Sequence, residues 1–367
     1  MSKRLFMDRA VKLHRVGLLL ASVLAAVIVS GAAAAATVTT VMTGLDNPRG
    51  LVFSPEGALY VAEAGRGGSS LPCRIQRGML TCYGATGAIS RLRHGVQEKW
   101  LTGLPSLAAA SGNEAEAGPQ DISFQGRGGA YVTMGLAGTP EGRALLGPNF
   151  TLSGKLLKVT ASGMVKEIAD LAAYEGAFNP GGGLVDSNPF GLLAMPGRQI
   201  VADAGGNTVL EVAANGAVTT LAAFAARANP TPIGPPFVES VATAIAQGPD
   251  GALYVSELTG VPFPTGFARI HRIAPDGTTS VYATGLTAVV DLSFSDDGTL
   301  YALQHASCGP FFACPGSIVR VAASAPHPVV YGGLSRPSAL AIGPDGAFYV
   351  SNKGASAGIG EVLRIEP

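Results

Sequence analysis

Three carboxylates recur at one position of a repeated sequence phrase, which makes them the first candidates for chemistry. Glu63 ends GALYVAE, Glu257 ends GALYVSE, and Asp203 ends the related RQIVAD. Carboxylates that are brought close together repel one another unless a cation, an arginine or a bound proton relieves them. A hard divalent ion with oxygen ligands would satisfy them, so Glu63, Asp203, Glu257 and Asn188 form a candidate calcium site.

A second set of polar side chains lies near the start of each copy of the phrase. Together with the three acids, these residues are candidates for ligand binding: Arg49, Asp121, Asn188, Asp291 and Arg336. The two arginines could neutralise the acids in place of calcium. The alternative is that each polar residue caps a local turn or pairs with a neighbouring unit, for instance Glu63 or Asp291 with an arginine. The sequence leaves both interpretations open.

The elements that must position these residues form a repeat. Six copies occur, at 47–63, 119–134, 188–203, 241–257, 289–304 and 336–352. Each copy has an apolar strand, a turn centred on Asp-Gly or a relative, and a second strand, which is typical of a β-hairpin. A third and a fourth strand come after most copies, as at 268–286 and 317–334. Four strands in each of six units predict an all-β, six-bladed β-propeller.

The two ends of the repeat array predict how the propeller closes. The sixth unit runs out after its third strand, GEVLRIEP at 360–367, whereas the strand at 37–45 precedes the first unit and has no sequence neighbour to pair with. We therefore expect residues 38–43 to pair with residues 361–366, because such closure protects the sheet edges. A pair of β-sandwiches is the rival architecture, but it gives no reason for six similar hairpins.

Composition agrees with this fold. The 367 residues are 47% hydrophobic and 14% charged, and they include 50 Gly and 25 Pro. Such a chain can bury a large core, and frequent Gly and Pro suit the many turns between short strands. The formal net charge is zero. The chain therefore lacks the basic balance of a nucleic-acid-binding protein, and we expect no nucleic-acid partner.

Residues 1–36 are predicted to be a signal peptide, and residues 37–367 the propeller. Basic residues precede the apolar run at 16–29, and SGAAAAA at 30–36 offers small residues for cleavage. An uncleaved anchor is the alternative, because the run extended through the alanines reaches about 20 residues. Either way the propeller is exported. After cleavage we expect a secreted or periplasmic protein without a membrane span, with 20 Lys and Arg against 24 Asp and Glu.

Export explains the four cysteines, which fall as two close pairs. In CRIQRGMLTC, a two-residue turn at Arg77 and Gly78 places Cys73 opposite Cys82, within the range of a disulfide. Cys308 and Cys314 close the shorter loop CGPFFAC. We therefore predict two local disulfides, Cys73 with Cys82 and Cys308 with Cys314, in preference to the crossed pairings. A metal site is disfavoured, because neither pair has C-x-x-C spacing or a neighbouring histidine.

Three stretches carry a resemblance to a known family: GLDNPRGLVFSPEGALYVAEAGRGG at 44–68, NPFGLLAMPGRQIVADAGGN at 188–207 and GALYVSELTGVPFPTGFARIHRI at 251–273. In these stretches the chain resembles the ScyD/ScyE-type secreted β-propellers, and more distantly it is similar to NHL-repeat and gluconolactonase-like propellers. The resemblance implies a propeller fold and export. It brings no established catalytic residues and no substrate.

Loop lengths predict where function lies. Connections after the second strand are long at 64–86, 135–153, 258–267, 305–316 and 353–359, and so are those between units at 103–118, 171–187 and 225–240. These connections emerge on one face of a propeller, where loops carry recognition. Because enzyme motifs are missing, we expect a monomer that binds a protein, glycan or small molecule there without catalysis. One alternative is a calcium-dependent lactonase or esterase, which the distant gluconolactonase-like resemblance suggests, with calcium on Glu63, Asp203, Glu257 and Asn188 polarising a carbonyl group. The other is a structural module of the cell envelope.

Overall fold

The computed structural model describes residues 36–69, 71–76, 78–109, 114–127 and 129–366. The predicted signal peptide lies outside these residues except for Ala36. Among the described residues, no helix is both long enough and apolar enough to cross a membrane. The structure confirms an all-β propeller with six blades.

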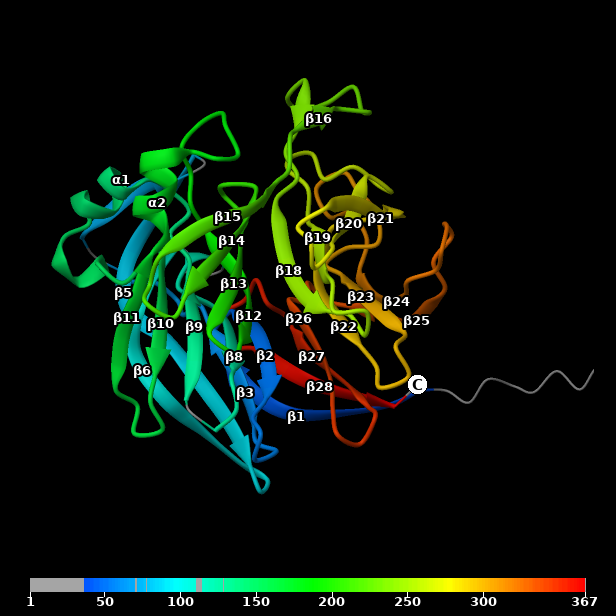
Figure 1. Ribbon diagram of the computed structural model, residues 1–367. Coiled ribbons are helices and arrows are strands. Elements are labelled where there is room, and N and C mark those ends of the chain that lie inside the picture. The colour runs from blue at the N-terminus through cyan, green and yellow to red at the C-terminus, as the bar shows by residue number, and fades with distance from the viewer. Residues whose placement is uncertain (1–35, 70, 77, 110–113, 128, 367) are drawn as a thin grey trace, which may run out of the picture. The chain divides into compact units, whose positions relative to one another are not determined.

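Each blade is an antiparallel sheet whose strands follow one another in the chain, apart from the last (Figure 1). Blade 1 contains β2 (Pro48–Phe53), β3 (Leu59–Glu63), β5 (Met79–Arg93) and β6 (Val96–Ala109). Blade 2 contains β8 (Pro119–Phe124), β9 (Ala130–Met134), β10 (Lys155–Val159) and β11 (Val165–Asp170). Blade 3 contains β12 (Pro189–Met195), β13 (Arg198–Asp203), β14 (Thr208–Ala213) and β15 (Val218–Ala223).

The remaining three blades have the same plan. Blade 4 contains β18 (Ala242–Gln247), β19 (Leu253–Glu257), β20 (Ala268–Ile273) and β21 (Thr279–Leu286). Blade 5 contains β22 (Val289–Phe294), β23 (Leu300–Gln304), β24 (Gly316–Arg320) and β25 (Val329–Leu334). Blade 6 contains β26 (Ala339–Ile342), β27 (Phe348–Asn352), β28 (Gly360–Glu366) and β1 (Thr37–Leu45). The first strands of neighbouring blades contact one another around the ring, so they form its inner wall.

The repeated phrase is the inner hairpin of each blade. Its turn needs a residue with positive φ, which glycine adopts without steric cost, and Gly57, Gly251 and Gly346 have φ of 80°, 76° and 75°. The apolar residues of the phrase pack between blades. Tyr254 and Ile270 of blade 4, for example, share one core cluster with Leu292 of blade 5.

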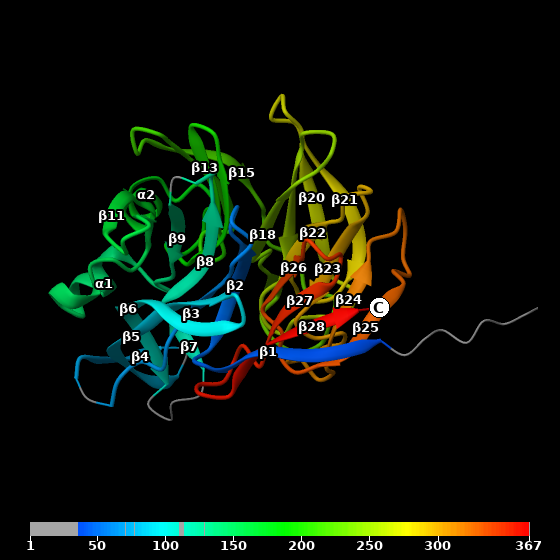
Figure 2. The same ribbon diagram turned by 90° about the horizontal axis from the view of Figure 1, so that it is seen from below.

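The N-terminal strand closes the ring. In β1, Val38 lies opposite Ile365 and Thr40 opposite Leu363 of β28, so the predicted pairing of the two chain ends is confirmed. Figure 2 shows β1 in blue beside β28 in red. Met42 and Leu45 are buried between this blade and blade 1. The sheet therefore joins the first described strand to the last.

Most additions to the blades come from the long connections. They are β4 (Cys73–Gln76), which pairs with β5; β7 (Ala115–Ala117), which pairs with β6; α1 (Pro140–Leu145); the 3-10 helix Pro148–Phe150; α2 (Leu171–Phe178); and the hairpin of β16 (Arg227–Ala228) and β17 (Phe237–Val238). Figure 1 shows α1, α2 and β16 at the same end of the molecule. Both predicted disulfides are confirmed, with S–S distances of 2.06 Å for Cys73–Cys82 and 2.01 Å for Cys308–Cys314.

Candidate functional site

A pocket of about 590 Å³ lies where the inner strands of blades 1 to 4 meet the long connections, and it is called the large pocket below. Its floor comes from the beginnings of four first strands, which supply Arg49, Gln120, Phe190 and Thr243. Its walls come from β7, the segment between β15 and β18 with its hairpin, the loop after β19, and the loop closed by the Cys308–Cys314 disulfide. Most of these walls are connections that the sequence shows to be long, and the short β13–β14 connection adds Ala204 and Gly205.

Among the described residues of this pocket, three buried polar side chains have an atom without a hydrogen-bond partner. The guanidinium of Arg49 donates to the carbonyl oxygens of Gly354 (2.6 Å) and Ala115 (2.9 Å), but its Nε has no partner. Oε1 of Gln120 and Oγ1 of Thr259 also have none. Arg49, Gln120 and Thr259 are only 8%, 2% and 0% exposed. Buried polar atoms are nearly always paired, so three such atoms in one pocket call for a ligand or ordered water.

Aromatic side chains form the apolar part of the pocket. Phe190, Phe237, Phe263 and Phe312 line it, and the rings of Phe263 and Phe312 stack with their centroids 4.0 Å apart. Phe263 and Phe312 come from the long connections of blades 4 and 5, and the structure brings them together. Flat apolar walls of this kind suit a ring-shaped ligand.

Several residues that line the pocket have positive φ angles, which are unusual for residues other than glycine. Val241, Thr259, Phe263 and Phe312 all line it, and their φ angles are 53°, 70°, 60° and 57°. Such positive φ is a true outlier for β-branched and bulky residues. Strained residues persist where the surrounding structure forces them, and they cluster at functional sites.

The charge of the pocket is mostly negative. Of the described residues that line it, Glu114, Glu116, Asp186 and Glu239 are acidic, whereas Arg49 alone is basic. Burial lowers the pKa of Arg49, while the nearby Glu114 and Glu116 act in the opposite direction and favour its charged form. The pocket therefore favours a neutral or positively charged ligand over an anion.

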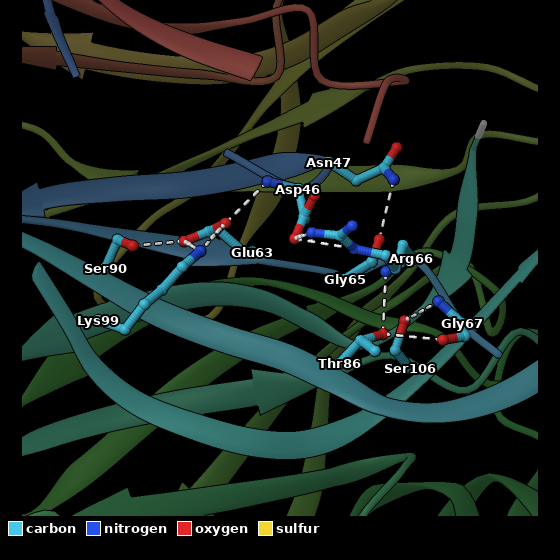
Figure 3. Close-up of polar contacts among 10 residues, drawn as sticks. All are labelled: Asp46, Asn47, Glu63, Gly65, Arg66, Gly67, Thr86, Ser90, Lys99 and Ser106. Atoms are coloured by element: carbon cyan, nitrogen blue, oxygen red, sulfur yellow. Dashed lines mark hydrogen bonds and ion pairs between the residues drawn. The ribbon is translucent and has the colours of Figure 1, made fainter. Parts of the chain in front are cut away.

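Glu63 does not reach this pocket. Its carboxylate is fully buried inside blade 1, where it accepts hydrogen bonds from the backbone N–H of Asp46 (2.7 Å) and the hydroxyl of Ser90 (2.5 Å). The ammonium of Lys99 lies 2.6 and 2.5 Å from its two oxygens. Figure 3 shows these partners around the carboxylate. The carboxylate is therefore neutralised where it stands.

Asp203 and Glu257 are also satisfied locally. Asp203 accepts the hydroxyl of Ser187 at 2.7 Å and the backbone N–H of Asn188 at 2.6 Å. Glu257 forms an ion pair with Arg227, and its Oε1 lies 2.7 Å from Nε2 of His271, within hydrogen-bond distance. These two acids have separate partners in blades 3 and 4. Neither lines the large pocket.

Glu63, Asp203 and Glu257, which were expected to meet in one cavity, thus each have separate partners, and none of them lines this pocket. The calcium site of these three acids and Asn188 stays a prediction. Within the part of the chain that the structure describes, no three His, Cys, Asp or Glu side chains stand together so as to hold a metal ion. Side chains at this position of the repeat instead form hydrogen bonds with the backbone of their own blade. Like Glu63 and Asp203, Gln304 accepts a backbone N–H from the segment entering its own blade, here that of Thr287 at 2.8 Å. These bonds correspond to the alternative named in the sequence analysis, in which each polar residue caps a local turn.

The other predicted residues divide into two groups. Arg49 and Asn188 line the pocket, and Oδ1 of Asn188 accepts the N–H of Leu136 at 3.2 Å. Asp121 and Asp291 instead join neighbouring blades, and burial raises the pKa of both carboxyls, that of Asp291 to about 7. The suggested pairing of Arg49 or Arg336 with Glu63 or Asp291 does not occur, because both guanidiniums bond to main-chain carbonyls.

Arg336 does not line the pocket, but it contacts the lining residue Phe312. Its Nη1 donates to the carbonyl of Phe312 at 2.8 Å, and its guanidinium lies 5.1 Å from the centre of the Phe312 ring. His305 meets the same ring edge-on, and its Nδ1 lies 2.8 Å from the carbonyl of Pro337. Burial, with the nearby arginines, lowers the pKa of His305 to about 4, so its ring is neutral and Nδ1 donates that bond.

Thr259 and Phe237 are site residues that no sequence pattern singles out. Both lie in connections that the sequence marks as long, 258–267 and 225–240. Length indicates that such a loop is functional, but it cannot indicate which side chain turns inward. That choice depends on contacts between loops, such as the backbone bond from Thr259 N–H to the Ser240 carbonyl at 2.9 Å.

Comparisons with known proteins support the fold. No protein-family model matches the chain, and a search of curated proteins finds no match. Among solved structures, it is similar to a soluble aldose sugar dehydrogenase from Escherichia coli, with TM-score 0.52 and 15% identity over 91% of this chain and 100% of that one. It is also similar to a gluconolactonase from Xanthomonas campestris, with TM-score 0.52 and 12% identity over 90% of each chain.

A streptogramin B lyase is a third similar structure, with TM-score 0.50 and 14% identity over 90% of this chain and 97% of that one. The three proteins carry different activities on one architecture. At these identities the likeness concerns the fold alone, because a propeller hosts many unrelated functions. The protein is thus a six-bladed β-propeller, and its function must be argued from its own pocket.

Proposed function

We propose that this protein is an exported β-propeller that binds a small organic molecule in the pocket at the inner ends of blades 1 to 4. The observation that carries the proposal is the set of three buried atoms without partners, Arg49 Nε, Gln120 Oε1 and Thr259 Oγ1, in that one pocket. They offer one donor, one acceptor and one hydroxyl that can act as either. A ligand that pairs with them regains the free energy lost by burying them.

The lining supports a more specific class of ligand. Four phenylalanines offer flat apolar contact, and four acids against one arginine among the described lining residues favour positive charge. An aromatic ring binds apolar faces, and a cation near such rings gains further from their quadrupole. The proposed ligand is therefore a small molecule with a ring and a polar edge, neutral or cationic.

The resemblance to ScyD/ScyE-type secreted propellers agrees with this proposal, because it implies export and brings no catalytic residues. Binding without catalysis is the function that we propose first. A lactonase activity of the kind named for the Xanthomonas protein is an outcome that a hydrolysis assay can reveal. A purely structural role in the cell envelope is another, and it would leave the pocket without a small ligand.

The test uses three probes with one ring and three charges: indole, tryptamine and indole-3-acetate. Isothermal titration of the purified protein is expected to give an affinity order of tryptamine, then indole, then indole-3-acetate. Phe263→Ala is expected to weaken tryptamine binding at least tenfold. Phe178→Ala is the matched control, because Phe178 is 68% exposed and does not line the pocket.

Two results would contradict the proposal. One is that none of the probes binds, and the other is that indole-3-acetate binds best, since that order requires a basic pocket. A separate assay measures hydrolysis of glucono-δ-lactone with calcium and with a chelator. Turnover that depends on Arg49 or Gln120 would replace binding by catalysis as the function of the same pocket.

A further inference from the structure

A buried glutamate on α2 has no partner. Glu175 is 1% exposed, and neither Oε1 nor Oε2 has a hydrogen-bond partner among the described residues. Leaving an ionised carboxylate buried and unpaired is among the most costly arrangements in a protein. Unmatched groups of this kind indicate a bound proton, a water or an ion. Glu175 does not line the large pocket, so the proposed ligand of that pocket does not account for it.

A second unpartnered oxygen faces the same place, beside Gly206 in the β13–β14 connection. A methyl group placed on Gly206 would lie 2.8 Å from Oε2 of Glu175 and 3.3 Å from Oγ1 of Thr208. Thr208 is 0% exposed, and its hydroxyl also lacks a hydrogen-bond partner within the described part of the chain. Because Gly206 lacks a side chain, two uncommitted oxygens from α2 and β14 converge beside its backbone.

A second acid, Asp203, adjoins this place and adds negative charge. Oδ1 of Asp203 accepts the backbone N–H groups of Gly205 and Gly206, each at 3.1 Å. The cluster therefore holds more carboxylate than its surroundings neutralise, and either protons or a cation must complete it.

We propose that Glu175 and Thr208 bind a calcium ion beside Gly206, with Asp203 adding negative charge behind them. Carboxylate and hydroxyl oxygens are ligands that calcium accepts, and water or carbonyl oxygens complete its flexible shell of six to eight. The site needs no group of three acids, in keeping with the absence of such a group among the described residues. With few charged ligands, the expected dissociation constant is on the order of 10⁻⁴ to 10⁻³ M, as in extracellular calcium modules.

This site differs from the one that the sequence suggests, in which Glu63, Glu257, Asp203 and Asn188 share an ion. Glu175 and Thr208 replace Glu63 and Glu257, and Asp203 remains as a neighbour. The ion also has a structural consequence. Asp203 holds the backbone N–H groups of Asn188 and Gly205, and both residues line the large pocket. A cation beside Asp203 would therefore stabilise one wall of that pocket.

The test is calorimetric titration of calcium chloride into the purified, chelator-treated and dialysed protein, with magnesium chloride as a second arm. We expect calcium to bind, and to bind better than magnesium, which demands stricter geometry. Glu175→Gln is expected to abolish calcium binding, and Thr208→Val to weaken it about tenfold. Glu141→Gln is the matched control, because Glu141 is an exposed glutamate on the neighbouring helix α1.

The same variants distinguish calcium from a proton. Glu175→Gln has the shape of the protonated acid, so a protonated Glu175 predicts a variant that melts like the wild type and a wild type that ignores calcium. That result would overturn the proposal, and so would calcium binding that survives in Glu175→Gln. If Glu175→Gln does not fold, Thr208→Val decides, because unaltered calcium affinity in that variant contradicts the site.

Discussion

Asp121 and Asp291 make the same pair of backbone hydrogen bonds in different blades. Asp121 accepts the N–H of Ile122 and, from the next blade, that of Leu192, both at 2.8 Å. Asp291 accepts the N–H of Leu292 at 2.8 Å and that of Leu340 in the next blade at 2.7 Å. Each carboxyl thus joins two inner strands. Both serve the ring and not the large pocket.

The first prediction concerns stability and pH. The pKa of Asp291 is about 7 in the folded protein, against about 3.9 in the unfolded chain. The folded state then binds more protons between these values, so this group's contribution to stability falls as the pH rises from about 4 to 7. Asp291→Asn should cost about 1–3 kcal/mol at pH 5, because its amide nitrogen cannot accept one of the two N–H bonds.

The cost of Asp291→Asn should become smaller at pH 8, where the wild type carries a buried charge and the variant does not. Urea unfolding at pH 5, 6, 7 and 8 measures this difference. Asp297→Asn is the control, because hydrogen bonding to Ser295 lowers the pKa of the exposed Asp297, which leaves it ionised throughout. If the difference in the free energy of unfolding between the wild type and Asp291→Asn stayed constant over this pH range, the pKa of Asp291 would be that of an ordinary aspartate, against the prediction.

The second prediction tests the ion pair inside blade 1. Lys99→Met leaves the fully buried carboxylate of Glu63 with only Ser90 and the Asp46 N–H as partners among the described residues. Breaking a buried pair costs about 3–5 kcal/mol, and we expect roughly 1–3 kcal/mol here because Lys99 is partly exposed. Lys166→Met, at an exposed lysine, should change the free energy of unfolding by less than about 0.5 kcal/mol. Equal changes in the free energy of unfolding for the two substitutions would contradict a stabilising ion pair between Lys99 and Glu63.

The third prediction concerns closure of the ring. Removing residues 37–44 deletes most of β1 and exposes the hydrogen-bonding edge of β28. Exposed edges promote association between chains, so the truncated protein should aggregate or melt at a clearly lower temperature. Light scattering and thermal unfolding report these effects. A monomeric truncation with the melting temperature of the longer protein would show that β1 is dispensable.

The fourth prediction links the Cys308–Cys314 disulfide to the large pocket. The loop that it closes carries Phe312 and bonds to the neighbouring loop through Gly309 N–H and Thr265 Oγ1 at 2.8 Å. Replacing both cysteines by serine should cost at most about 2–3 kcal/mol, because the loop is short. The loss in the free energy of tryptamine binding should exceed the loss in the free energy of unfolding. The matching change at Cys73 and Cys82 should leave that binding unaltered, since neither cysteine lines the pocket.

Much of the fold could be predicted from the sequence, because the same physical requirements recur in every unit. Each hairpin needs the same glycine turn and the same apolar alternation, so a copy that is weak alone is recognised by comparison with the others. The pairing of 38–43 with 361–366 can be inferred by counting strands. The local disulfides can be inferred from spacing.

The candidate site was less predictable, for a physical reason. Repeat symmetry places Glu63, Asp203 and Glu257 at equivalent backbone positions, but it does not fix the direction of their side chains. Lys99 lies on the fourth strand of blade 1 and His271 on the third strand of blade 4, both outside the aligned phrase. They contact the carboxylates of Glu63 and Glu257 within their own blades. Partners such as Arg227 arise from the long connections, in which the six units differ.

The pairing of β1 with β28 makes the propeller sensitive to whether its own chain is complete. A ribosome produces β1 before any other strand of the ring and β28 after all the others, so their contact is as non-local as the chain permits. Pairings of this kind form slowly. Before β28 is synthesised, the hydrogen-bonding edge of β1 is unpaired. In a chain that lacks β28, this edge stays unpaired. Ring closure thus distinguishes finished molecules from unfinished ones, and it leaves the latter exposed to proteases and to aggregation.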